Sequence, residues 1–277
     1  MISTAQLRIE PAPVCEPARP LLEVRGLSRA FGGVKAVDDV SFAVIGTRIH
    51  ALIGPNGAGK TTLFNLVAGV IAPSAGRVLL GECEVTELST AERARAGLQR
   101  TFQNLQVFSE LTALESVMLG AHLRSEASFL KALFNTPSVR RSNAEARDRA
   151  EALLVRVRIE SYRHVRPDAM PYGALKRLDI ARALAADPKL LLMDEPAAGL
   201  NPAETAAMRD LIADIARDGV TVLLVEHDMK LVMSVAEVIV VLDYGRKLAE
   251  GGPDEIRRNP EVIRAYLGGG TTRRRQR

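Results

Sequence analysis

Three short apolar runs without strict alternation of apolar and polar residues indicate buried strands. The runs are RIHALIG, KLLLMDE and VTVLLVEH, each bounded by turn or polar residues. Strands that are buried on both faces of a parallel sheet are apolar almost throughout, whereas half-buried strands alternate. A helical pattern follows each run, so we expect an α/β fold built on a parallel sheet.

Two helix starts carry capping signals. Thr112 and Glu115 fit a capping box in front of SVMLGAHL. In NPAE, Asn201 takes the N-cap position, Pro202 the first helical position and Glu204 the third. We therefore expect helices to begin at these points within a few residues.

A helical insertion is expected within the α/β core, at about residues 104–186. Residues 145–158, EARDRAEALLVRVR, predict a charged amphipathic helix. The preceding stretch, RSEASFLKALFNTPSVRRSN, fits either a helix or a mobile loop.

The composition of the 277 residues is 47% hydrophobic and 25% charged, which is ordinary for a globular protein. The composition shifts only near residue 20 and after Leu267, so we expect one domain over residues 21–267. Residues 1–20 contain four prolines and no continuous apolar core, which predicts a disordered leader and not a secretory signal. No apolar run approaches the roughly 18 residues of a membrane-spanning helix, and we expect a cytosolic chain.

Charge and cysteine content add little. The net charge is +4, but four arginines lie in the last five residues, so the basic tail at 268–277 accounts for the excess. The tail fits a solvated end, or a contact with anionic lipid or a partner; we expect no nucleic-acid partner. Cys15 and Cys83 have neither disulfide nor metal-ligand spacing and are expected to be plain thiols.

A phosphate-binding loop is indicated by GPNGAGKTT, which begins at Gly54 directly after a predicted strand and leads into the helical pattern TLFNLVAGV. This is GxxxxGK[ST], the P-loop (Walker A) motif, in its strand and helix context. The backbone N–H groups and the helix N-terminus bind phosphate, Lys60 reaches the β and γ phosphates, and Thr61 offers a hydroxyl to Mg²⁺. We expect ATP and Mg²⁺ as cofactors. The residues expected to hold the nucleotide here are Gly54, Asn56, Gly57, Ala58, Gly59, Lys60, Thr61 and Thr62.

Two carboxylates end the run LLLMDEP. Asp194 and Glu195 lie where a parallel strand ends, at the edge of the sheet where ligands bind in open α/β folds. Asp194 suits metal coordination through water, and Glu195 can polarise the attacking water in phosphoryl transfer. Alone, such a pair also fits a strand end followed by a turn.

Further motifs in a specific order give a family resemblance. After the P-loop come RTFQN, PYGALKRLDIARAL, LLLMDEP, AAGLNP and LLVEHD. In this order they resemble an ABC-type ATPase, the nucleotide-binding subunit of membrane transporters, over about residues 21–267. The resemblance implies a P-loop NTPase (RecA-like) parallel-sheet core with an N-terminal antiparallel β subdomain and an inserted α-helical subdomain.

The same resemblance assigns further roles. Gln103 would bridge the bound Mg²⁺ to the transmembrane partner, and His227 would contact the γ-phosphate and the attacking water. Phe31 would stack on adenine. Alternatively, these three are a surface glutamine, a histidine at a strand end and a core phenylalanine. No motif includes the other histidines, which are expected to be structural or at the surface: His50, His122 and His164.

One signature departs from the family pattern. Where the family has Leu-Ser-Gly-Gly-Gln, this chain has Met170, Pro171, Tyr172, Gly173 and Ala174. Proline removes the serine hydroxyl but is tolerated at a helix start, and Gly173 still permits a close backbone approach. By the resemblance, Tyr172 and Gly173 would contact the ATP of the opposite subunit. Asn201 also stands where many relatives have aspartate. We expect a working ATPase; a nucleotide-binding regulator without hydrolysis and a soluble ABC ATPase of DNA repair or translation are the alternatives.

A finer resemblance is to the importer branch for branched-chain amino acids. It depends on FGGVKAVDDVSF, on RTFQNLQVFSELTALESV and above all on VEHDMKLVMSVAEVIVVLDYGRKLAEGGPDEIRRNPEVIRAYLG. The chain looks like the longer of the two ATPase subunits of that branch. The resemblance implies a second ATPase subunit of a different type, with a second copy of this chain as the alternative. It also implies two permeases, indirectly a solute-binding protein, and a peripheral location on the cytoplasmic face of the inner (plasma) membrane. Leucine, isoleucine and valine are the default solutes; urea, short amides and aromatic acids stay open.

Overall fold

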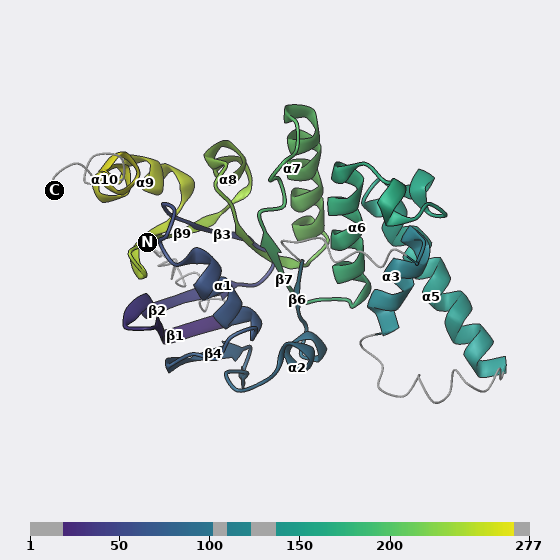
Figure 1. Ribbon diagram of the computed structural model, residues 1–277, viewed down its shortest axis with the longest axis horizontal. Coiled ribbons are helices and arrows are strands. Elements are labelled where there is room, and N and C mark those ends of the chain that lie inside the picture. Colours follow the sequence, from purple (N-terminus) through teal and green to yellow (C-terminus); the bar gives the residue numbers. More distant parts are fainter. Residues whose placement is uncertain (1–18, 102–109, 123–136, 269–277) are drawn as a thin grey trace, which may run out of the picture.

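A six-stranded sheet forms the centre of the molecule (Figure 1). The computed structural model describes residues 19–101, 110–122 and 137–268. The strand order is β10-β9-β3-β8-β7-β6, and every neighbouring pair is parallel except β9 and β10. The strands are β3 (Ile49–Ile53), β6 (Leu98–Arg100), β7 (Leu190–Asp194), β8 (Thr221–Val225), β9 (Val238–Asp243) and β10 (Arg246–Gly251).

The three apolar runs form β3, β7 and β8, and the prediction of parallel strands is confirmed. Every residue of these three strands is buried. Successive side chains point to opposite faces, and each face has its own apolar cluster: Ala51, for example, belongs to one cluster and Leu52 to the other. The absence of alternation in the sequence therefore reflects burial on both faces.

A smaller antiparallel sheet packs beside the central sheet, as the family resemblance implies. Its order is β2-β1-β4-β5. The strands are β1 (Pro20–Phe31), β2 (Val34–Ile45), β4 (Ala75–Leu80) and β5 (Cys83–Glu84). Figure 1 shows helix α1 (Lys60–Ala68) between the two sheets, and residues of α1 share a buried cluster with both. This position fixes the loop in front of α1 at the edge of the central sheet.

The remaining helices cover the other face and one end of the molecule (Figure 1). Those on the other face or at the ends of strands are α2 (Thr90–Arg95), α7 (Pro202–Arg217), α8 (Met229–Val235), α9 (Pro253–Arg258) and α10 (Pro260–Gly268). A separate helical group consists of α3 (Ala113–His122), α5 (Pro137–Arg156), α6 (Tyr172–Ala185) and the 3₁₀ turns Glu160–Tyr162 and Pro167–Ala169. In this group α3 and α6 approach closely: a Cβ on Gly120 would lie 2.5 Å from the carbonyl oxygen of Arg182.

Both predicted capping boxes are present. The Thr112 hydroxyl accepts from the Glu115 N–H at 3.3 Å, and the Glu115 carboxylate accepts from the Thr112 N–H at 2.8 Å. Asn201 and Glu204 make the same reciprocal pair at the start of α7, with Pro202 at the first helical position.

The amphipathic helix predicted over 145–158 is present but has different bounds. It extends back to Pro137 and ends at Arg156. Arg158 has a left-handed φ of 61°, which ends the helix before residue 158.

Some predictions concern residues outside the described ranges. The disordered leader up to residue 18, the stretch that fits a helix or a loop up to residue 136, and the basic tail from residue 269 are among them. The leader was predicted to extend to residue 20, but Pro20 already begins β1. The domain boundaries also stay predictions. Cys83 is a free, exposed thiol. Across the described ranges, no helix combines the length and the apolar character that crossing a bilayer requires.

Candidate functional site

The loop 54–60 joins β3 to α1 and needs glycine at two close approaches. Gly54 and Gly59 have φ values of 153° and 95°. A Cβ on Gly54 would overlap the carbonyl oxygen of Leu242, and one on Gly59 would overlap that of Ala36. Only glycine tolerates both the backbone conformation and the contact. The loop is therefore held against β9 and β2 by the backbone itself.

Lys60, the first residue of α1, folds back over this loop. Its Nζ donates hydrogen bonds to the carbonyl oxygens of Gly54 at 2.7 Å and Pro55 at 2.9 Å. Partial burial lowers the pKa of Lys60, and the nearby carboxylate of Glu195 opposes that shift. The side chain is thus held above the loop at the N-terminus of α1, where the helix favours anions.

The other predicted loop residues differ in exposure. Asn56, Gly57 and Thr61 are exposed, Ala58 is buried, and Gly59 and Thr62 are intermediate. The exposed residues form the rim that a phosphate group would meet first.

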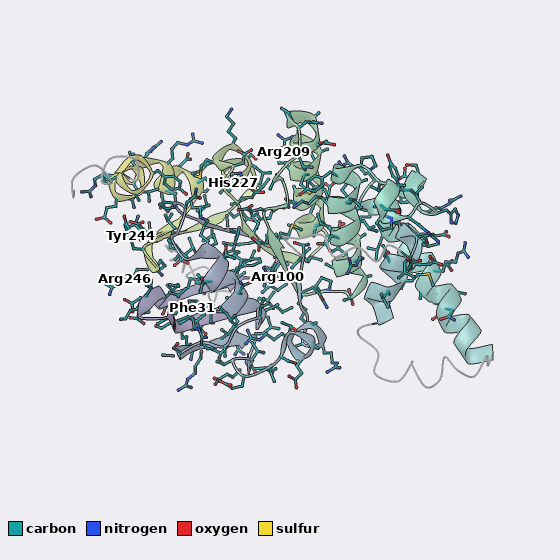
Figure 2. All side chains as sticks on the ribbon, in the orientation of Figure 1. Phe31, Arg100, Arg209, His227, Tyr244 and Arg246 are labelled. Atoms are coloured by element: carbon teal, nitrogen blue, oxygen red, sulfur yellow. The ribbon has the colours of Figure 1, made fainter. Side chains whose placement is uncertain are left out.

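Asp194 ends β7 and is paired with Arg100, the last residue of β6. Arg100 Nη2 donates to Asp194 Oδ2 at 2.8 Å, and Nη1 donates to Oδ1 of Asn65 on α1 at 2.5 Å. The guanidinium also lies 5.0 Å from the centre of the Phe64 ring. Burial raises the pKa of the Asp194 carboxyl, and Arg100 opposes the rise. Figure 2 places Arg100 near the middle of the molecule.

Glu195 and His227 follow neighbouring strands and their side chains approach each other. His227 Nδ1 lies 3.7 Å from Glu195 Oε1. Glu195 has a left-handed φ of 47°, and its N–H donates to the Val225 carbonyl oxygen at 2.9 Å. The carbonyl oxygen of Glu195 accepts from Lys176 Nζ at 3.2 Å. The structure therefore brings together the carboxylate and the imidazole that lie 32 residues apart in the sequence.

Glu226 is a third acidic residue at this edge. It follows β8 directly, and its side chain is wholly buried. It accepts hydrogen bonds from the backbone N–H groups of Ala197, His227 and Asp228. Burial raises the pKa of Glu226, and these three N–H groups oppose the rise.

Residues 170–174, which differ from the family signature, still lead into a helix. Pro171 is the N-cap of α6, one residue earlier than a first-turn position, and its carbonyl oxygen accepts from the N–H groups of Ala174 and Leu175. Tyr172 is 46% exposed, so its ring is open to a partner. Gly173 is buried: a Cβ there would lie 2.8 Å from Oε1 of Glu204 on α7. Gly173 thus packs closely against Glu204 of the same chain, and its predicted contact with the nucleotide of the opposite subunit stays a prediction.

One predicted residue lies apart from this cluster. Phe31 ends β1 and is 46% exposed, so it is not a core phenylalanine; the guanidinium of Arg29 lies 5.0 Å from its ring centre. Figure 2 shows Phe31 at the antiparallel sheet. Gln103 lies outside the described residues.

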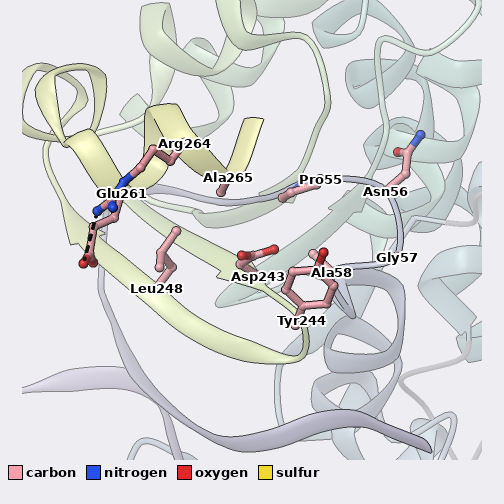
Figure 3. A pocket seen from close by; sticks show the side chains of 10 residues that line it. All are labelled: Pro55, Asn56, Gly57, Ala58, Asp243, Tyr244, Leu248, Glu261, Arg264 and Ala265. Atoms are coloured by element: carbon pink, nitrogen blue, oxygen red, sulfur yellow. Dashed lines mark ion pairs between the residues drawn. The ribbon is translucent and has the colours of Figure 1, made fainter. Parts of the chain in front are cut away.

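A cavity adjoins the tip of the phosphate-binding loop (Figure 3). Its volume is about 490 Å³, and it opens between the loop, the β9–β10 turn and α10. The lining residues include Asn56, Tyr244 and Arg264 but none of the charged residues at the ends of β7 and β8. Burial raises the pKa of Tyr266 on α10 to about 12, and a hydrogen bond with the Gly54 backbone opposes the rise. The C-terminal helix therefore supports the loop from the side.

The residues near the loop 54–60 suit Mg²⁺ that is bound together with substrate phosphates better than a metal ion whose ligands all come from the protein. The described part of the chain contains no group of three or more His, Cys, Asp or Glu side chains that could hold a metal ion. Thr61 and Asp194 supply a hydroxyl and a carboxylate, and Mg²⁺ commonly takes one or two such oxygens together with substrate phosphates.

Sequence reasoning missed Arg100, Glu226 and Lys176. Each is a charged residue within or next to a buried segment, and that contradiction is the only signal the sequence offers. They lie within RTFQN, LLVEHD and PYGALKRLDIARAL, but the resemblance gave them no role, and their partners Asp194, Ala197 and Glu195 lie in another segment of the chain.

Two family models match the chain. A model described as "ABC transporter" matches residues 37–198, and one described as "Branched-chain amino acid ATP-binding cassette transporter" matches residues 246–271. The second match covers β10, α9 and α10.

Curated proteins and solved structures agree with these matches. The chain is 46% identical to the high-affinity branched-chain amino acid transport ATP-binding protein BraF of Pseudomonas aeruginosa, covering 91% of this chain and 99% of BraF. It is 43% identical, with the same coverage, to LivG of Escherichia coli, which has the same description. A nucleotide-free ATP-binding cassette from an ABC transporter has a TM-score of 0.78 at 29% identity, covering 89% of this chain and 98% of that one. The ADP conformation of the cassette MJ1267 gives the same TM-score and identity, covering 90% of this chain and 99% of that one.

Proposed function

This chain belongs to the ABC transporter family of ATP-binding proteins, and we propose that it hydrolyses ATP to power the import of branched-chain amino acids. One observation carries the proposal: the P-loop lysine, the carboxylates of Asp194 and Glu195, and His227 gather at one edge of the parallel sheet. That edge is where phosphoryl chemistry is performed in open α/β folds.

ATP binding is assigned to the loop 54–60 and the start of α1. Lys60 would leave the carbonyl oxygens of Gly54 and Pro55 for the β and γ phosphates, which are stronger acceptors because they are charged. Phe31, with its exposed ring at the end of β1, would stack on adenine. Thr61 and Asp194 would hold Mg²⁺, with Gln103 as a further ligand, and the ion would neutralise charge on the phosphates.

Hydrolysis is assigned to Glu195 and His227. The Glu195 carboxylate accepts a proton from a water molecule as the water oxygen bonds to the γ-phosphorus. The bond from that phosphorus to the bridging oxygen breaks, and ADP and phosphate leave. His227, 3.7 Å from Glu195 in the structure, would donate a hydrogen bond to the γ-phosphate and hold the water.

The subunit would work in an assembly at the cytoplasmic face of the inner membrane. The family implies membrane permeases, and we propose two permeases and a second ATPase subunit of a different type. The start of α6, including Tyr172 and Gly173, would close on the ATP held by that second subunit. Pro171 lacks the usual hydroxyl, which removes one charge-assisted hydrogen bond, so the site closed by α6 is expected to be the slower by about tenfold to a hundredfold.

The solute is proposed from the C-terminal match and from the names of BraF and LivG. Residues 246–271 match the model that is specific to branched-chain amino acid transporters. These residues contribute β10, α9 and α10, and Tyr266 of α10 contacts the P-loop, so the region is part of the ATPase fold.

The test replaces Glu195 by glutamine in the complex co-expressed with its permeases and second ATPase. We expect ATP to bind with near-normal affinity and phosphate release to fall by about 10²- to 10⁴-fold, because glutamine cannot accept the proton. Uptake of labelled leucine into proteoliposomes should stop as well.

Glu82→Gln is the matched control, since Glu82 is an exposed residue between β4 and β5. It should leave both rates unchanged. Undiminished phosphate release in Glu195→Gln would refute the role of Glu195, and hydrolysis without uptake of leucine, isoleucine or valine would refute the proposed solutes.

A further inference from the structure

Glu226 places its carboxyl group in a position from which water is excluded. Its side chain is 0% exposed, directly after the buried strand β8. Burying a carboxylate is costly unless hydrogen bonds satisfy both oxygens. The cost of burying Glu226 is offset only by its hydrogen bonds, so its partners are informative.

The partners of Glu226 belong to two different loops. Oε1 accepts from the N–H of Ala197 at 2.8 Å, in the loop that follows β7. Oε2 accepts from the N–H of His227 at 3.1 Å and from that of Asp228 at 3.4 Å. One side chain therefore joins the loop of Glu195 to the loop of His227.

A second link joins the same two loops through the backbone. The N–H of Glu195 donates to the carbonyl oxygen of Val225 at 2.9 Å. Together with the bond to Ala197, this fixes the backbone on both sides of Glu195. The left-handed conformation of Glu195 is unfavourable for a non-glycine residue and persists only when its surroundings hold it.

A carboxylate is suited to joining the two loops because its two oxygens accept hydrogen bonds and donate none. Glutamine at position 226 has the same length but presents an NH₂ group to one set of N–H donors, which leaves them unsatisfied. Aspartate keeps the charge but is one methylene shorter, so it cannot reach both loops.

We propose that Glu226 is a positioning residue that holds Glu195 and His227 in register for ATP hydrolysis. It acts through these two loops and contacts neither the nucleotide nor the attacking water. The inference rests on the proposed ATPase function and adds to it a residue of LLVEHD to which the family resemblance gave no role.

The experiment measures ATP hydrolysis by Glu226→Gln and Glu226→Asp in the complex with the second ATPase and the permeases. Both variants should lower kcat by about tenfold to a hundredfold, the effect of losing a hydrogen bond to a charged group. The KM for ATP should stay within about twofold, because the P-loop and Lys60 are untouched. Glu237→Gln, at an exposed glutamate before β9, is the matched control and should change neither value.

Amide hydrogen exchange tests the contacts directly. In the wild type, the N–H groups of Ala197, His227 and Asp228 should be protected, and the protection should fall in both Glu226 variants. Weak protection of Ala197 in the wild type would overturn the proposal even if neither variant folds.

A double variant separates positioning from a general loss of folded protein. In a His227→Ala background, Glu226→Gln should lower kcat by a clearly smaller factor than in the wild-type background, because one of the two groups that Glu226 positions is already absent. A purely structural defect would lower kcat by the same factor in the His227→Ala background as in the wild-type background. The same factor in both backgrounds, or wild-type kcat in Glu226→Gln and Glu226→Asp, would overturn the proposal.

The activity of the wild-type complex separates a failure of the proposed function from a failure of the role proposed for Glu226. If the wild-type complex does not hydrolyse ATP, the proposed function fails. If it does and both variants match it, the function stands and the role of Glu226 is wrong.

Discussion

At the scale of single residues, the candidate site depends on charged groups that the central sheet buries. Asp194 is paired with Arg100, and Glu226 is bonded to three backbone N–H groups. Each group is held by contacts with other segments, and none is free to turn into solvent. These buried groups are therefore in place before a nucleotide arrives, whereas Lys60 would exchange its bonds to the loop for bonds to the phosphates. Groups that are already in place need no reorganisation during the reaction.

His50 is a buried group outside the site, and it links stability to pH. It lies on β3, is 1% exposed, and its Nε2 lies 3.1 Å from the Ile45 N–H. Burial lowers its pKa from the ordinary value of 6.5, and the Ile45 backbone opposes the shift. The unfolded state then binds more protons than the folded state in acid. The stability contributed by neutral His50 is complete above pH 6.5 and is lost as the pH falls from there through the lowered pKa.

We expect the free energy of unfolding to fall by up to about 1.4 kcal/mol per pH unit from this group in that window. His50→Gln should flatten the slope relative to wild type, as measured by urea unfolding at a series of pH values. The matched change His164→Gln, at an exposed histidine, should leave the slope as it is. Equal slopes in His50→Gln and wild type would contradict the assignment.

At the scale of elements, helix starts are the features that the sequence specifies most directly. The starts of α3 and α7 were predicted from capping boxes and are confirmed, because a cap is a local interaction among four neighbouring residues. The bounds of α5 were not predicted correctly, because the helix ends before Arg158 takes a left-handed conformation and not at a capping residue. Helix α6 starts without any side-chain cap, behind Pro171.

Substitutions of Asn201 measure what its N-cap contributes to the stability of the fold. Asn201→Ala should lower the free energy of unfolding by about 1 kcal/mol, since it removes the bond to the Glu204 N–H. Asn201→Asp keeps the acceptor and should unfold like the wild type within about 0.5 kcal/mol. Chemical denaturation of both variants checks this, and an equal loss in Asn201→Asp would show that the amide matters for another reason.

At the scale of the whole molecule, the site is built from strand ends that are distant in the sequence. The apolar runs were enough to predict the parallel sheet, and the site residues that the motifs indicate stay predictions. The runs and the motifs could not predict the strand order, nor that Arg100 would meet Asp194 or that Glu226 would meet Ala197. Those pairings depend on tertiary contacts between segments that carry no local signal for one another.

Nucleotide binding should stabilise the whole fold. At a concentration of ATP and Mg²⁺ a hundred times the Kd, the free energy of unfolding should rise by about 2.7 kcal/mol, a Tm increase of roughly 5 to 10 °C. Lys60→Ala should lose most of this increase, and so should removal of Mg²⁺ by EDTA, as measured by thermal unfolding.

Lys247→Ala, on β10, is the control and should keep the full increase. The comparison is between Tm values with and without ligand for each protein, because Lys60 also bonds its own loop. The same increase in Lys60→Ala as in wild type would contradict the assignment of the P-loop.

The position of β3 in the strand order has a consequence for how the chain folds while the ribosome synthesises it. Its hydrogen-bonded neighbours are β8 and β9, with Ile49 opposite Val222 and His50 opposite Val238. A nascent chain therefore exposes the P-loop strand without either flanking strand until residues beyond 220 have emerged. Pairing across so many residues is slow, and an unpaired apolar strand is prone to aggregate meanwhile. Chaperones that shield nascent apolar segments should matter more for this chain than its small size suggests.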